Sequence, residues 1–276
     1  MLRVTLGLSI AFAVVGAAAP AAAEITTFAN YSGTGGANMY WQRLGSTYVA
    51  TGTAAQVAAS RTAARGTAGG HFFTIANATS TTPGAVAAMF TFLNPHLYEL
   101  GALASSYRFD AVAHAGSVAQ AAGGFVYQPI MSGTFSFTYT GAADLRVNHT
   151  IYRTGANLLS ATFAGGTIAG QTGATSGSVN ASTSVAGETI AYTSDFIDFG
   201  RTIDQDLSIS LSSITRSLFA GPNQALRSFA ATTTGSFSTD PLPSLTAPVP
   251  EPATWSLLVA GFGLVGLSRQ RALAAG

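Results

Sequence analysis

The densest group of side chains that could do chemistry is a set of four aspartates near residue 200. It comprises Asp195, Asp198, Asp204 and Asp206, with Arg201 among them. Because calcium takes about six to eight oxygen ligands, Asp198, Asp204 and Asp206 are weak candidates for a Ca²⁺ site. However, the sequence has no D-x-D-x-D-G loop, and carboxylates at strand ends, partly paired with Arg201, would give the same pattern. We therefore expect no metal and no cofactor.

The histidines and serines do not form a recognisable catalytic arrangement. His71, His96, His114 and His149 are widely separated in the sequence. The chain also lacks a G-x-S-x-G nucleophile elbow. Two carboxylates that cleave a glycoside can meet in space without sharing a motif, so a secreted hydrolase remains an alternative. On balance, the residues favour a protein that is not an enzyme.

A proline-rich segment lies near the C-terminus. Residues 240–252 contain five prolines. Since proline fixes φ and removes a backbone donor, we expect an extended, semi-rigid, solvated spacer here. The spacer ends at Pro250, Glu251 and Pro252, where the prolines oppose helix formation and keep the backbone accessible.

The apolar segment that follows predicts a short transmembrane helix over residues 253–268. Its apolar part, which begins at Trp255, would be about 20 Å long as a helix, whereas a hydrocarbon core is about 30 Å thick. Arg269 and Arg271 predict that residues 269–276 stay on the cytoplasmic side, with the preceding chain outside. The short span favours transient insertion over a permanent anchor.

The stretch VPEPATWSLLVAGFGLVGLSRQR resembles the PEP-CTERM sorting signal, in the variant with Trp three residues after the Pro-Glu-Pro. Two departures are Ser256, where Ala is usual, and the thin basic cluster, in which Gln270 separates the arginines. The matching positions are Pro250, Glu251, Pro252, Trp255, Gly261, Gly263, Gly266, Arg269 and Arg271.

This resemblance implies a substrate of an exosortase-type membrane processing enzyme. Such a protein is inserted transiently in the inner membrane of a Gram-negative bacterium, processed at or near the motif, and then released or attached at the cell surface. The resemblance also implies an association with exopolysaccharide and biofilm. The three glycines of the apolar segment would make a smooth helix that a membrane protease could approach closely.

The N-terminal end predicts a secretory signal peptide over residues 1–23. Arg3 supplies the basic region, an apolar run follows, and small residues lead to Ala23. Cleavage is expected between Ala23 and Glu24. An uncleaved anchor is the alternative, and the small residues argue against it. Both ends of the chain therefore predict an exported protein.

Composition excludes several classes of partner. Charged residues make up 8% of the chain and the net charge is +1. All the basic residues are arginines, and they are scattered, so no basic patch could neutralise a run of phosphates and nucleic-acid binding is not expected. With no cysteine, the chain has neither a disulfide framework nor a thiolate metal site.

Between the two ends, residues 24–239 predict one all-β domain, an antiparallel β-sandwich or jelly roll. Aromatic and hydroxyl residues alternate through the run 133–140, which places Phe135, Phe137 and Tyr139 on one buried face. A split near residues 116–124 is the alternative to one domain. The predicted strands are His71–Ala76, Ala88–Leu93, Ser106–Ala113, Gly133–Thr140, Ile190–Phe199, Leu207–Ile214 and Arg227–Ser238.

Other parts of this body are less clearly patterned. A helix is expected over residues 54–68, and residues 165–184 are either a loop or strands of small residues. The hydroxyl-rich runs Thr232–Ser236 and Ser182–Ser184 predict a flat face that suits carbohydrate or ice, although such faces also arise wherever a sheet meets water. The body is thus either a structural matrix protein or a binding module for polysaccharide or an ice-like surface.

Overall fold

The computed structural model describes residues 25–43, 69–77, 79–113, 117–130 and 132–246. The predicted signal peptide with its Ala23–Glu24 cleavage site, the helix expected over 54–68, and the predicted transmembrane helix at 253–268 lie outside these residues. Within the described part, no helix is long and apolar enough to cross a membrane.

The described residues form strands, turns and one short 3₁₀ helix, η1 (Tyr98–Leu100). The strands are β1 (Thr26–Gly33), β2 (Met39–Arg43), β3 (Gly70–Thr74), β4 (Val86–Phe92), β5 (Ala102–Ala113), β6 (Gln120–Ala122), β7 (Phe125–Pro129), β8 (Ser132–Tyr139), β9 (Leu145–Val147), β10 (Thr150–Tyr152), β11 (Asn157–Ala164), β12 (Thr167–Gln171), β13 (Gly177–Ser182), β14 (Thr189–Thr193), β15 (Ile197–Asp198), β16 (Asp204–Ser212), β17 (Phe229–Asp240) and β18 (Ser244–Leu245).

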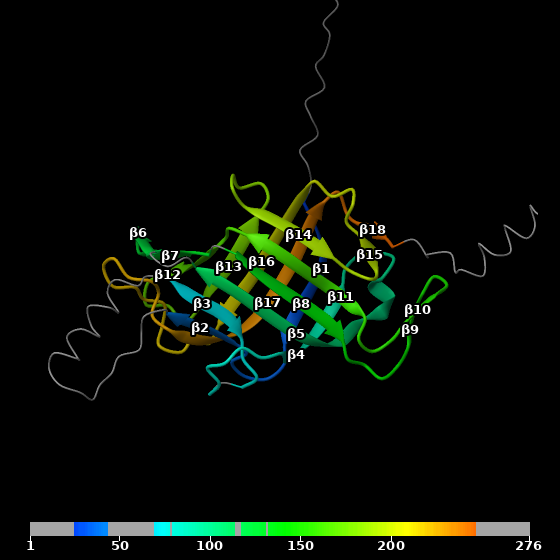
Figure 1. Ribbon diagram of the computed structural model, residues 1–276, viewed down its shortest axis with the longest axis horizontal. Coiled ribbons are helices and arrows are strands. Elements are labelled where there is room, and N and C mark those ends of the chain that lie inside the picture. Colours follow the sequence, from blue (N-terminus) through cyan, green and yellow to red (C-terminus); the bar gives the residue numbers. More distant parts are fainter. Residues whose placement is uncertain (1–24, 44–68, 78, 114–116, 131, 247–276) are drawn as a thin grey trace, which may run out of the picture.

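Fourteen of these strands form one antiparallel sheet that folds over on itself in two layers. In Figure 1 the strands of one layer, β5, β8, β11 and β14, cross those of the other, β1, β13, β16 and β17. The long strands β5 and β17 connect the layers. The first half of β5 pairs with β4 and its last residues pair with β3. The first residues of β17 pair with β2, and its second half pairs with β1.

The pairs β2–β3 and β1–β4 complete this connection between the layers. The predicted all-β class and the antiparallel pairing are therefore confirmed. The two layers nevertheless belong to one continuous hydrogen-bonded sheet, because the short strands carry the ladder around the edge from one layer to the other.

Each of the seven predicted strands overlaps an observed strand. The region 165–184, which the sequence left open between a loop and small-residue strands, forms β12 and β13. Its glycines have a packing reason: a Cβ built on Gly170 would lie 2.4 Å from Leu218 Cδ1, and one on Gly177 would lie 2.8 Å from the same atom. Small residues here make room for a buried leucine from a distant loop.

An aromatic cluster fills the space between the two layers. Phe135, Phe137 and Tyr139 are buried, as their alternation predicts. Phe237 of β17 lies at the centre of the cluster, with ring centroids of six aromatic neighbours between 5.0 and 6.5 Å away. These neighbours come from both layers and are Phe28, Tyr31, Phe90, Phe135, Phe137 and Tyr192.

The beginning of the proline-rich spacer lies on the body, which differs from the solvated segment expected from its prolines. β18 pairs with β15, and Asn94 Nδ2 donates a hydrogen bond of 2.9 Å to the Pro243 carbonyl. Leu242 and Leu245 pack against the core. A buried amide and apolar contacts thus hold a segment that local composition marks as exposed.

We expect Phe237→Ala to destabilise the body by about 3–5 kcal/mol, because the truncation leaves a cavity among six rings. The neighbouring substitution Ser236→Ala, on the outward face, should change stability by no more than about 0.5 kcal/mol. Chemical denaturation of both variants measures the difference. Equal stability of the two would contradict the central role of Phe237.

Alkaline pH should unfold the protein through its buried tyrosines. Burial raises the pKa of Tyr31 to about 12, and burial also raises the pKa of Tyr107 and of Tyr192 well above the ordinary value of 10.0. Above about pH 10 the unfolded chain ionises these groups and the folded chain does not, so stability present below pH 10 is lost as pH rises toward 12.

The expected loss is about 1.4 kcal/mol per pH unit for each tyrosine that stays neutral in the folded state. Denaturation midpoints measured against pH, together with phenolate absorbance, test this. Tyr192→Phe should give a shallower decline than wild type. Ionisation of all tyrosines near pH 10 in a chain that stays folded would contradict the expectation.

Candidate functional site

The outer face of the layer that contains β16 and β17 carries short polar side chains. In β16 the alternate residues Leu207, Ile209 and Leu211 are buried, so Ser208 and Ser210 point outward. The same alternation operates in the neighbouring strands and gives two rows that run across the sheet. The first row is Thr91, Asn30, Ser236, Ser208, Asn180 and Thr167; the second is Met89, Ser32, Thr234, Ser210, Ser178 and Ala169.

We call these two rows the hydroxyl face. Strand register aligns them, since each residue is the direct cross-strand partner of the next through β4, β1, β17, β16, β13 and β12. With strands about 4.8 Å apart, each row extends over about 24 Å. The face therefore matches an extended ligand better than a small compact one.

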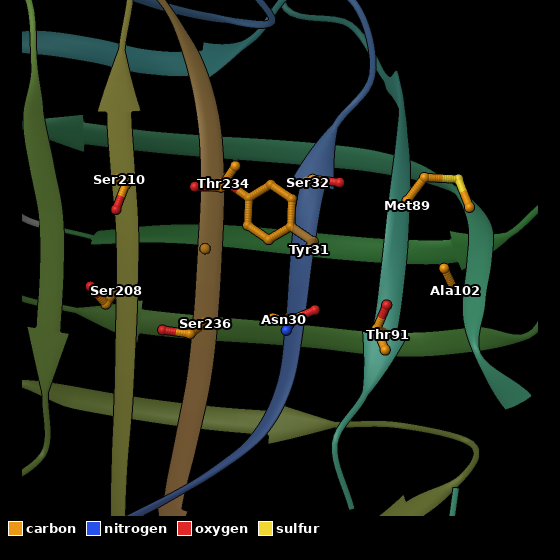
Figure 2. Close-up of a pocket in the computed structure, with 11 residues that line it drawn as sticks. Asn30, Tyr31, Ser32, Met89, Thr91, Ala102, Ser208, Ser210, Thr234 and Ser236 are labelled. Atoms are coloured by element: carbon orange, nitrogen blue, oxygen red, sulfur yellow. The ribbon is translucent and has the colours of Figure 1, made fainter. Parts of the chain in front are cut away.

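A shallow hollow of about 440 Å³ lies in the middle of this face. Figure 2 shows its labelled side chains on β16, β17, β1, β4 and the start of β5, with the Tyr31 ring beside the strand that carries Thr234 and Ser236. Gly235 makes this arrangement possible, because a Cβ at that position would lie 2.5 Å from Tyr31 Cε1. The missing side chain lets the tyrosine pack under the sheet surface.

Most polar groups of the hydroxyl face are available to a ligand. Ser208 Oγ donates to Asn180 Oδ1 at 3.0 Å, and Asn180 Nδ2 donates to Ser178 Oγ at 2.9 Å, which fixes the orientation of that amide. Within the described residues, the side chains of Ser210 and Ser236 make no hydrogen bond. These hydroxyls can both donate and accept.

The hydroxyl face carries no ionisable side chain in either row. Asp206, in the next row, marks its margin opposite Ser238. The outer face of the other layer differs, since Arg108 and Asp110 project from β5 and Asp110 Oδ1 lies 2.8 Å from His71 Nε2. The two outer faces therefore present different chemistry: one is neutral, and the other is charged.

Two exposed aromatic rings extend the neutral face at one edge. Tyr127 on β7 is the partner of Ala169, and Phe125 is the partner of Gln171. Their side chains are 39% and 47% exposed, and their ring centroids are 6.4 Å apart in a stacked arrangement. Exposed rings next to hydroxyl and amide groups can stack on apolar faces of a ligand while the polar groups orient it.

Only part of this face is indicated by the local sequence. The outward positions of Thr232, Thr234 and Ser236 agree with the predicted hydroxyl-rich run, although Thr233 between them is buried. In the second run, Ser182 ends β13 opposite Asp206. The predicted strand over residues 207–214 includes Ser208 and Ser210, and the one over residues 88–93 includes Thr91. Asn30, Phe125 and Tyr127 lie outside the predicted strands and are placed by strand register.

The four aspartates are dispersed. Asp195 Oδ2 accepts a hydrogen bond from the Asn157 amide at 2.7 Å, and Asp198 Oδ1 accepts one from Gly200 at 2.8 Å. Asp204 and Asp206 lie on β16. Across the described ranges, no three His, Asp or Glu side chains are grouped so that they could hold a metal ion.

Arg201 does not neutralise these carboxylates as expected. The ion pairs found in the described part join His71 to Asp110 and Arg153 to Asp144. Asp195, Asp198 and Asp204 instead accept hydrogen bonds from backbone amides or a hydroxyl, whereas Asp206 Oδ1 is buried without a hydrogen-bond partner among the described residues. Backbone N–H groups thus take the place of the Arg201 guanidinium as partners of Asp195 and Asp198.

Comparison with known proteins bears on the C-terminal motif. The family model of the PEP-CTERM protein-sorting motif matches residues 248–272. The match includes Pro250, Glu251, Pro252 and Trp255, the three glycines Gly261, Gly263 and Gly266, and the arginines Arg269 and Arg271. No curated protein and no solved structure matches the chain.

The chain thus carries a PEP-CTERM sorting motif at its C-terminus. Such a motif implies an exported protein that an exosortase-type enzyme recognises and processes at the membrane. The motif itself lies outside the described residues. The body before it supplies the neutral hydroxyl face.

Proposed function

We propose that this protein is a non-enzymatic component of the cell envelope or extracellular matrix that associates with exopolysaccharide through its hydroxyl face. In this proposal residues 24–239 act as a sandwich-like domain. The tail delivers the domain to the surface, where it is released or attached after processing. The observation that carries the proposal is the pair of uncharged rows that cross six strands beside two exposed aromatic rings.

The chemistry of the face favours an uncharged polysaccharide. Sugar hydroxyls can exchange hydrogen bonds with Ser, Thr and Asn side chains, and no ionised group has to lose its hydration shell. The rings of Phe125 and Tyr127 offer apolar surface for the C–H faces of sugars. An extended chain can contact both features at once, because they lie on the same side of the sheet.

The described residues also support a binding role over a hydrolytic one. In the His71–Asp110 pair, the histidine Nε2 bonds the carboxylate, and within the described part no serine or threonine hydroxyl bonds that ring. A general base in a hydrolase has to reach the nucleophile it activates. The hydroxyl face itself contains no carboxylate for acid–base catalysis.

Binding of the full chain to a neutral glucan tests this proposal, with an anionic polymer such as alginate for comparison. Ser210→Glu combined with Thr234→Glu places two charges in the hydroxyl face. This double variant should weaken glucan binding about tenfold or more, because a loss of about 1.4 kcal/mol in binding free energy raises the Kd tenfold. Affinity electrophoresis or calorimetry provides the measurement.

The matched control is Thr134→Glu with Thr162→Glu, which places two charges at paired, exposed positions on the other outer face. This variant should bind the glucan as the wild type does. If the wild type binds no polymer, or if both variants lose affinity equally, the hydroxyl face is not the binding site. Release of reducing ends would identify a hydrolase, and thermal hysteresis without glucan binding would favour an ice-like surface.

A further inference from the structure

The chain is held on the body up to Thr246, immediately before the sorting motif. We call residues 241–246 the clasp. Ser244 and Leu245 pair with β15, the Thr246 amide donates to the Phe196 carbonyl at 3.0 Å, and Asn94 holds the Pro243 carbonyl in a buried hydrogen bond. Because backbone and side-chain hydrogen bonds hold this segment on the body, it does not act as a flexible linker.

The clasp leaves little chain between the folded body and the motif. Only residues 247–249 separate Thr246 from Pro250. Fully extended, the four steps from Thr246 to Pro250 span at most about 14 Å. An enzyme that binds Pro-Glu-Pro in a cleft therefore lies close to the end of the body that holds the clasp.

That end of the body has three exposed apolar side chains, each on a segment bonded to the clasp or its neighbours. Ile203 is 77% exposed, and its amide donates to the carbonyl of Asp240, the residue before the clasp, at 2.7 Å. Tyr98 is 63% exposed, and its amide donates to the carbonyl of Asn94, whose side chain holds the clasp.

The third side chain, Ile151, is 44% exposed and belongs to β10. Its neighbour Tyr152 stacks on Phe196 with ring centroids 4.0 Å apart, and Phe196 accepts the Thr246 hydrogen bond. In Figure 1 the strands β10, β15 and β18 lie together at one end of the molecule, while β6 and β7 lie at the other. Three exposed apolar side chains thus lie on segments that contact the clasp directly or through one neighbouring residue.

We propose that this end of the body, with Tyr98, Ile151 and Ile203, is a docking surface for the membrane-embedded exosortase-type enzyme that processes the tail. The inference rests on the proposed processing of the tail and adds a second recognition element outside the motif. The enzyme is the favoured occupant because it grips residues 250–252, whereas the apolar membrane segment begins only at residue 253. The clasp keeps the docking surface and the motif at a short, limited separation.

The rate of C-terminal processing in cells that contain the enzyme tests the proposal. Pulse-chase labelling with mass spectrometry of the product compares wild type with the double variant Tyr98→Ser, Ile203→Ser. Removing two apolar contacts should slow processing about tenfold. The matched control, Val112→Ser with Phe219→Ser, removes two exposed apolar side chains on segments that are not bonded to the clasp, and it should be processed at the wild-type rate.

A spacer provides a second arm. A Gly/Ser insert of about twelve residues between Thr246 and Ala247 frees the motif from the body. With this insert, the double variant and the wild-type body should be processed at rates within about twofold of each other. The longer linker lowers the effective concentration of the docking surface at an enzyme that has bound the motif, so the surface contributes little to binding. A tenfold difference that persists despite the spacer would contradict the role of limited separation.

The outcomes separate this inference from the proposed function. If the wild-type tail is not processed at all, the processing hypothesis itself fails. If the wild type is processed and the double variant keeps its rate, the docking surface is overturned. Flotation of the full chain with anionic lipid vesicles lacking the enzyme gives the last control: a loss of vesicle binding specific to the double variant would identify lipid as the partner and overturn the proposal.

Discussion

The packing of aromatic rings between two crossing layers is the interaction on which the rest of this structure depends. The chain has few charged residues and many small ones, so ion pairs contribute little and the apolar core must supply most of the stability. Phe237 contacts rings from both layers, and the buried Tyr31 hydroxyl joins the cluster through Tyr107 and Thr233. Because the large side chains point inward, the outward positions are left to serine, threonine and asparagine, and the hydroxyl face follows from the core.

Local pattern predicted those parts of the fold that local sequence determines. The strict alternation around Phe135 and Phe137 predicted a strand and its buried face, and the predicted strand Leu207–Ile214 overlaps β16. The connection of the layers through β1–β4 and β2–β3 could not be predicted in this way, because pairing between distant segments leaves no mark on either one. The same holds for the rows of the hydroxyl face, where Asn30 and Thr91 become neighbours only through register. In β12 and β13, Gly170 and Gly177 leave the space that Leu218 occupies, and this contact with a distant loop has no counterpart in the local sequence pattern.

The spacer shows how a long-range contact overrides composition. Its prolines predict an exposed, extended segment, and the segment is indeed extended where β18 forms. Asn94, 149 residues earlier in the chain, nevertheless binds the Pro243 carbonyl in a buried site. The sorting motif thus follows directly on a folded element, and cleavage at or after residue 247 leaves that element intact. The body and the tail are structurally coupled although their sequence signals are separate.

A C-terminal tail that acts as a processing signal is removed from the mature protein. The most direct test is the intact mass of the mature protein purified from cells that carry the exosortase-type enzyme and from cells that lack it. We expect a C-terminus at or near Pro250-Glu251-Pro252 in the first case and at Gly276 in the second. A mature chain that still ends at Gly276 in the presence of the enzyme would contradict it.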